Sequence, residues 1–185
     1  MKLSFSTRGW PGFSFDEMVE MATEMGFSGI EVYNLPKFDA LIDRGGPFHK
    51  YNTAATVRRL RDMQLDIPCF DTSLDISLGG SVADEVKSLM DMAYTARVPY
   101  VVVCAIDGDE DRVYSALEAL VPYAESIGVS ILVKTSGIYS DTGRLRNMLD
   151  RFASDNLAVL WDIHHPYRDN GESGDQTIKN LGCYV

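Results

Sequence analysis

The chain has 185 residues, of which 45% are hydrophobic, and a formal net charge of −10. That length and apolar content suffice to bury one core, so we expect a single domain over residues 1–185. The acidic balance argues against a nucleic-acid partner, because phosphate binding requires an excess of Lys and Arg. No apolar run approaches the roughly 20 residues of a bilayer span, so no membrane partner is expected.

The N-terminal residues and the cysteines indicate the compartment. The opening Met1–Phe5 has no long apolar core and no small-residue cleavage site, which argues against a signal peptide. The cysteines, Cys69, Cys104 and Cys183, show no CxxC spacing. The first two lie in apolar runs, where a reduced, buried thiol is expected. We therefore predict a cytoplasmic protein.

A helix followed by a short apolar strand recurs along the chain. After a first strand at residues 3–6, the predicted helices span 13–25, 53–63, 82–97, 113–127 and 142–152, and the strands that follow them span 30–33, 65–70, 100–105, 130–133 and 157–161. Ser14 or Asp16 is expected to cap the first helix, and Gly26 to end it. Residues 177–185 resemble a helix, a Gly stop and the first residues of a seventh strand.

Apolar strands that alternate with helices predict a parallel sheet covered by helices, which is an α/β fold. The strand spacing suits a TIM-type barrel, in which eight units take about 250 residues, so about six of eight units fit this chain. A doubly wound open sheet is the alternative. The turn at residues 6–12 lacks the glycine fingerprint of dinucleotide-binding sheets, which favours the incomplete barrel.

The last predicted strand ends in an unusual group of polar residues. The apolar run 157–160 is followed by Trp161, Asp162, Ile163, two histidines and, shortly after, Arg168. Parallel α/β proteins place their chemistry at the carboxyl ends of the strands. Burying carboxylate and imidazole groups is costly unless they pair or bind a ligand. This segment is therefore the first candidate for a functional site.

Four segments together resemble the xylose isomerase-like TIM-barrel superfamily, often described as sugar phosphate isomerases/epimerases. They are residues 1–7 (MKLSFST), 26–32 (GFSGIEV), 131–135 (ILVKT) and 161–166 (WDIHHP). The resemblance covers the whole chain but only about three-quarters of an eight-stranded barrel. Its most specific part is the element from Asp162 to His165.

The resemblance implies a divalent metal site. In this family Mn, Mg or Zn is held by a Glu on strand 5, an Asp on strand 6, a His on strand 7 and a Glu on strand 8, and the two Glu residues also move protons on the sugar carbons. Asp162 matches the strand-6 ligand, and His165 matches a histidine that contacts a substrate oxygen. Lys134 stands where the pattern has the strand-5 Glu. We therefore expect a metal only in a complete form of the site.

Three interpretations of Lys134 remain open. Its ammonium can pair with Asp162 and take the place of the missing cation. It can be a Schiff-base amine that attacks a carbonyl substrate. It can also have no catalytic role, either because the chain has lost its activity or because other segments carry that activity.

Other polar residues at strand ends are weaker candidates. Glu31 and Asp71 can bind sugar hydroxyls, or can be ordinary loop or capping groups. Arg168 can grip a phosphate or carboxylate, or form a surface salt bridge. Trp10 can stack on a sugar ring, or form a hydrophobic lid contact. For Asp162 and His165, the alternative to a site is a pair that ties the strand to its loop.

The function expected from this pattern is sugar isomerase/epimerase chemistry on a small polyhydroxylated carbonyl compound, by proton transfer through an enediol-like intermediate. In it, Lys134 and Asp162 are the catalytic candidates. A catalytically incomplete barrel that binds a sugar-like ligand or a partner is the first alternative, and a Schiff-base lyase using Lys134 is the second. Six barrel strands leave two unpaired edges, which predicts self-association or a C-terminal tail folded across the gap.

Overall fold

The computed structural model describes residues 2–37, 39–106 and 108–185. It contains one sheet of six parallel strands in the order β1-β2-β3-β4-β5-β6. The strands are β1 (Ser4–Ser6), β2 (Gly29–Tyr33), β3 (Cys69–Asp75), β4 (Tyr100–Cys104), β5 (Ser130–Lys134) and β6 (Leu157–Leu160). Sequential order and parallel pairing confirm the predicted incomplete barrel over a doubly wound sheet, whose strand order reverses.

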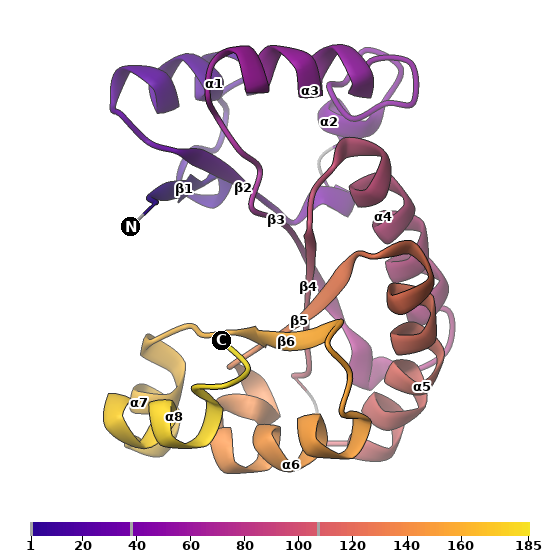
Figure 1. The fold of residues 1–185 in the computed structure, drawn as a ribbon, viewed down its shortest axis with the longest axis vertical. Coiled ribbons are helices and arrows are strands. Elements are labelled where there is room, and N and C mark those ends of the chain that lie inside the picture. Colours follow the sequence, from indigo (N-terminus) through magenta and orange to yellow (C-terminus); the bar gives the residue numbers. More distant parts are fainter. Residues whose placement is uncertain (1, 38, 107) are drawn as a thin grey trace.

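Helices cover the outer, convex side of this curved sheet (Figure 1). The α-helices are α1 (Phe15–Glu24), α2 (Asp39–Ile42), α3 (Thr53–Asp62), α4 (Val82–Ala96), α5 (Glu110–Ile127), α6 (Thr142–Phe152), α7 (His164–Asn170) and α8 (Gly174–Leu181). Short 3-10 turns are η1 (Thr7–Gly9), η2 (Leu35–Lys37), η3 (Ile76–Leu78) and η4 (Gly137–Ser140). No helix in the described ranges has both the length and the apolar character that a bilayer span requires.

The core lies between the sheet and the helices. Outward-facing strand residues such as Ile30, Phe70, Val101 and Ile131 are completely buried there. Because strand side chains alternate between faces, their neighbours in sequence point to the inner, concave side. The sheet thus presents its second face to the space that a closed barrel would fill.

The sheet does not close over the residues that the structure describes. β1 and β6 are its two edges, and they lie apart on the open side of the molecule (Figure 1). The segment after α8 returns to β6, where the Val159 amide donates a hydrogen bond to the Tyr184 carbonyl (2.9 Å). The predicted start of a seventh strand is therefore present as a single backbone contact, and residues 182–185 do not span the gap.

Four elements differ from the sequence prediction. β3 begins at Cys69 and extends to Asp75, later than the predicted 65–70, since the run before it pairs only through an isolated bridge at Asp66. α8 begins at Gly174, capped by Ser173, ahead of the predicted start at Thr177. α2 and α7 were not predicted, because both are short and neither carries a long apolar period.

Candidate functional site at the strand ends

Charged side chains from neighbouring strands share the inner face near the carboxyl ends. In the parallel register Tyr33 lies beside Asp71, and Lys134 lies beside Leu160. Glu31 is two residues before Tyr33 and so faces the same way. Asp162 follows β6 directly. We define the strand-end site as Glu31, Asp71, Lys134, Asp162 and His165.

Lys134 pairs with Asp71 across the intervening strand β4. The distance from Lys134 Nζ to Asp71 Oδ2 is 3.5 Å, and the two side chains are 17% and 5% exposed. The Ser73 amide also donates to Asp71 Oδ1 (2.9 Å). In the part of the chain that is described, Lys134 therefore pairs with Asp71 and not with Asp162. This corrects the first interpretation of Lys134, because β3 brings a buried carboxylate within its reach.

Glu31 is held by a serine from the neighbouring strand. Ser6 Oγ donates to Glu31 Oε1 (2.7 Å), and Ser6 is the register partner of Glu31 on β1. The charges of the strand-end site also act on the Cys69 thiol, which lies on β3 two residues before Asp71. Burial raises the pKa of the Cys69 thiol to about 12, the carboxylates of Glu31 and Asp71 add to this, and Lys134 opposes it.

Asp162 is fixed at the end of β6 by Thr135, the residue after Lys134. The Asp162 amide donates to Thr135 Oγ1 (2.8 Å), which donates in turn to the Asp162 carbonyl (3.1 Å). The carboxylate accepts from the His164 amide (3.0 Å), and its Oδ2 lies 3.6 Å from His165 Nε2. The carboxylate–imidazole pair, which the sequence offered as the alternative to a functional site, is therefore present in the structure, and the role of these residues in a site stays a prediction.

The other ring nitrogen of His165 faces a second carboxylate. Nδ1 lies 3.2 Å from Asp169 Oδ2 and 2.9 Å from an Arg168 guanidinium nitrogen. Arg168 also binds both oxygens of Asp169 (2.6 and 3.1 Å). Hydrogen bonding to Arg168 lowers the pKa of the Asp169 carboxyl, desolvation opposes this, and the bond to His165 adds to the lowering. The imidazole is thus oriented between two carboxylates.

Arg168 and Trp10 occupy different surroundings. The Arg168 side chain is 53% exposed and committed to Asp169, so its availability for an anionic ligand stays a prediction. Trp10 packs against Phe5 and Phe13, with ring centroids 5.7 and 5.6 Å away. Phe5 belongs to the outward-facing set of β1, opposite Ser6. These contacts place Trp10 in an aromatic cluster beside β1, and stacking on a sugar ring stays a prediction.

Sequence reasoning missed three residues that organise the site. Ser6 and Thr135 are ordinary hydroxyl residues whose roles come from register with Glu31 and Asp162, which only the folded sheet reveals. Asp169 carried a usable signal, because it lies four residues after His165, and that spacing puts two side chains on one helix face. The helix itself, α7, was not predicted.

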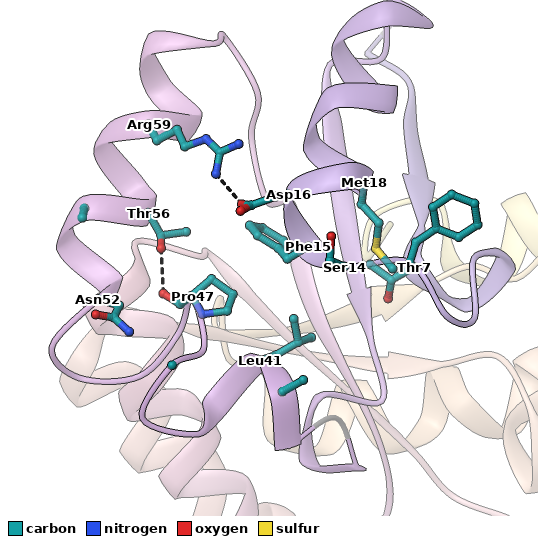
Figure 2. Close-up of a pocket in the computed structure, with 14 residues that line it drawn as sticks. Thr7, Ser14, Phe15, Asp16, Met18, Leu41, Pro47, Asn52, Thr56 and Arg59 are labelled. Atoms are coloured by element: carbon teal, nitrogen blue, oxygen red, sulfur yellow. Dashed lines mark hydrogen bonds and ion pairs between the residues drawn. The ribbon is translucent and has the colours of Figure 1, made fainter.

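A separate cavity of about 510 Å³ lies between α1, α3 and the segment around α2 (Figure 2). Phe15, Met18 and Leu41 form apolar parts of its wall, and an ion pair between Asp16 and Arg59 bridges the two helices. The strand-end residues do not line this cavity. It is therefore distinct from the predicted site.

Sequential parallel strands, an outer layer of helices and charged groups at the carboxyl strand ends define a protein of the TIM-barrel class. The chain belongs to the xylose isomerase-like TIM barrel family, whose model matches residues 19–182. No functionally curated protein sequence matches this chain.

Several solved structures show the same fold as this chain. A probable 3-DHS dehydratase, AsbF, of Bacillus anthracis is 19% identical and superposes with a TM-score of 0.81 over 100% of this chain and 71% of that one. A D-tagatose 3-epimerase-like protein is 17% identical, with a TM-score of 0.73 over 98% and 71%. The IOLI protein, solved with a bound zinc atom, is 15% identical, with a TM-score of 0.75 over 95% and 67%. At these identities the likeness concerns the fold.

The residues described do not fit a divalent metal. Nowhere in the described ranges do three His, Cys, Asp or Glu side chains come close enough together to hold an ion. Asp162 is engaged with His165 and the His164 amide, and the strand-5 position carries the Lys134 ammonium, which donates hydrogen bonds and adds positive charge. Metal binding by a complete form therefore stays a prediction, and no chemical step is assigned to a metal.

Proposed function

We propose that this protein moves a proton between adjacent carbons of a small polyhydroxylated carbonyl compound, as a sugar isomerase or epimerase does. The observation that supports this most is the Asp162–His165 pair at the end of β6, 3.6 Å between Oδ2 and Nε2. A strand-end imidazole oriented by carboxylates suits the binding of a substrate oxygen or the transfer of its proton.

The remaining strand-end residues have matching roles. Glu31 and Asp71 are acceptors for sugar hydroxyls on the same inner face, and Lys134 supplies the cation. Arg168 provides a second cation for an anionic group of the substrate, which it would bind after releasing Asp169. Membership of a family with dehydratase and epimerase-like neighbours agrees with substrates of this size and oxygen content.

Isotope exchange tests this function. The protein is incubated with a panel of aldoses and ketoses in D₂O, with and without added Mn²⁺, and deuterium entering the carbon next to the carbonyl is followed by NMR. We expect exchange with at least one sugar, and a rate about 10²- to 10⁴-fold lower in His165→Gln if the imidazole transfers protons. Absence of exchange under every condition would contradict the proposal.

A second candidate function is binding without catalysis. It is supported by Lys134, which occupies the strand-5 ligand position and is paired with Asp71. Tight stoichiometric binding of a divalent ion in a calorimetric titration would contradict a degenerate site, and the isotope-exchange experiment separates the two candidates.

The Schiff-base alternative is less well supported by the geometry. Attack on a carbonyl requires the neutral amine, and loss of that proton would leave the Asp71 carboxylate, whose side chain is 5% exposed, without its cation. Borohydride trapping with carbonyl substrates, followed by intact mass, tests it, and a protein without added mass excludes the lyase.

We also propose that the protein is cytoplasmic. We propose further that it self-associates through its open sheet edges. β1 and β6 each carry a free hydrogen-bonding edge along much of their length in the described part of the chain. Unpaired edges of this kind favour strand pairing between molecules.

A further inference from the structure

The contact with Asp71 leaves N–H donors of the Lys134 ammonium available. An ammonium carries three N–H donors, and charge-assisted bonds to carboxylates are typically about 2.7–2.9 Å long. Its distance to Asp71 Oδ2 is 3.5 Å, and Asp71 is its only ion-pair partner among the described side chains. Donor capacity therefore remains on the inner face of the sheet.

Asp71 fixes the position of this cation. Its side chain is 5% exposed and is itself held by the Ser73 amide. A carboxylate anchored in this way restrains the end of a long, flexible side chain. Because the Lys134 side chain is only 17% exposed, its charge is poorly screened and acts strongly on a ligand that reaches the same face.

The connection between the Lys134 segment and the Asp162 segment is also relevant. The next residue, Thr135, holds the backbone of Asp162, so the chain segment that carries the ammonium is tied to the segment that carries the Asp162–His165 pair. The cation and the imidazole thus come from adjacent strand ends. Proton transfer next to a carbonyl needs these two functions together, a base for the carbon-bound proton and a positive group at the oxygen.

We propose that Lys134 is a catalytic residue that binds the substrate carbonyl oxygen and stabilises the charge that develops on it, so that the reaction needs no divalent metal. This inference rests on the proposed proton-transfer function. A carboxylate or imidazole of the strand-end site takes the proton from carbon. The C–H electron pair forms the C=C bond, the carbonyl π pair moves to oxygen, and Lys134 donates an N–H to that oxygen. Return of the proton to the same carbon from the other face re-forms the original carbonyl and completes epimerisation. In isomerisation the hydroxyl proton of the deprotonated carbon passes to the former carbonyl oxygen, the C=C pair takes the returning proton at the former carbonyl carbon, and the second C–O bond becomes the carbonyl.

The experiment measures deuterium exchange from D₂O into D-fructose, D-tagatose and D-glucose in excess EDTA, and again after Mn²⁺ is added in excess of the chelator. We expect exchange to proceed in EDTA. Removal of one donor to a developing oxyanion costs about 10²- to 10³-fold in rate, and we expect that loss in Lys134→Met. Lys134→Arg, which keeps the charge, should retain part of the rate. Lys179→Met, which removes an exposed ammonium from α8, should leave the rate unchanged.

Folding is controlled with a second variant. Lys134→Met leaves Asp71 buried without its cation, so circular dichroism accompanies each measurement. The double variant Asp71→Asn/Lys134→Met removes both charges and avoids the uncompensated carboxylate. Asp71→Asn alone keeps the ammonium, so it should exchange faster than the folded double variant, and equal rates in the two would count against the proposal.

The outcomes separate the two levels of inference. Exchange that requires added Mn²⁺, or that is undiminished in a folded Lys134 variant, would overturn the role of Lys134 and leave the proton-transfer function standing. Absence of exchange in the unmodified protein, with and without metal, would instead contradict the proposed function and the role of Lys134 with it.

Discussion

At the scale of single residues, the inner face of the sheet combines burial with charge. Asp71 is 3% exposed yet lies within 3.5 Å of Lys134. The same face carries Cys69 and Cys104, whose thiols respond to these charges. Substitution of one charged group is therefore expected to affect the stability of the protein as well as its chemistry.

Lys134→Met should lower the free energy of unfolding by about 3 kcal/mol, because it leaves a buried carboxylate without its cation. Urea unfolding measured by circular dichroism provides the value. Asp71→Asn/Lys134→Met should recover most of the loss, since neither charge is then buried alone. Equal stability of the single variant and the unmodified protein would show that the pair is open to solvent.

The three cysteines should differ in reactivity. Burial raises the pKa of Cys69 to about 12 and that of Cys104 to about 11, and nearby carboxylates contribute in the same direction. The thiolate is therefore scarce at pH 8, and both should react with iodoacetamide at least about 100-fold more slowly than an ordinary exposed cysteine. Peptide mass spectrometry should find Cys183, which is exposed, modified first. Rapid labelling of Cys69 in the folded protein would contradict its burial.

At the scale of single elements, helix ends and turns are set by local chemistry that the sequence partly displays. α1 begins with a capping box, in which Ser14 Oγ accepts from the Glu17 amide (3.3 Å) and Glu17 Oε2 accepts from the Ser14 amide (2.7 Å). The hydrogen bonds that the Ser14 amide and the Ser14 hydroxyl donate to Glu17 Oε2 lower the pKa of the Glu17 carboxyl. α4 begins at Val82, and the side chain of its N-cap residue, Ser81, makes no capping hydrogen bond.

Ser14→Ala should destabilise the protein by about 1 kcal/mol, whereas Ser81→Ala should have a much smaller effect. Because the pKa of Glu17 is lowered in the folded protein, its carboxylate stabilises the fold above its ordinary pKa. This stabilisation is lost as the pH falls through the pKa of Glu17 in the folded protein. The difference between Ser14→Ala and the unmodified protein should therefore shrink in acid. Thermal unfolding at neutral and acidic pH measures both effects, and equal losses for the two serines would count against the capping box.

Two glycines with the same backbone conformation should differ in their tolerance of alanine. Gly137 (φ +61°) begins η4, and a Cβ there would lie 2.1 Å from the Ala105 carbonyl oxygen. Gly171 (φ +60°) ends α7, and nothing would lie within 4 Å of its Cβ. Gly171→Ala should cost about 1–2 kcal/mol from the backbone conformation alone, and Gly137→Ala clearly more. Similar unfolding midpoints for the two variants would show that β4 and η4 can separate freely.

At the scale of the whole molecule, much of the architecture was predictable because alternating helices and apolar strands leave few topologies. The parallel order of strands and the incomplete barrel follow from that repetition. Contacts between distant strand ends were not predictable, since the Lys134–Asp71 pair depends on sheet curvature and on a β3 that extends beyond its apolar run. Asp162 and His165 could be singled out because they follow an apolar strand and match the family pattern, and their pairing was the alternative to a functional site.

The open edges lead to a prediction about oligomeric state. Sedimentation velocity should show association that increases with protein concentration, because β1 and β6 expose backbone donors and acceptors. Leu3→Lys, next to β1, should weaken this association, since charged side chains on sheet edges oppose pairing. Leu78→Lys on η3 is a matched control, as the two leucines are 55% and 58% exposed. A monomer at every concentration, or equal effects of both variants, would contradict pairing through β1.

The ion pair that skips β4 has a mechanical consequence. Neighbouring strands lie about 4.8 Å apart, so groups on β3 and β5 start from a separation of nearly 10 Å in a flat sheet. Bending toward the inner face shortens that span, and flattening lengthens it. The salt bridge between Lys134 and Asp71 therefore resists unrolling of the sheet, and its loss should accelerate hydrogen exchange of the β4 amides before the outer helices are affected.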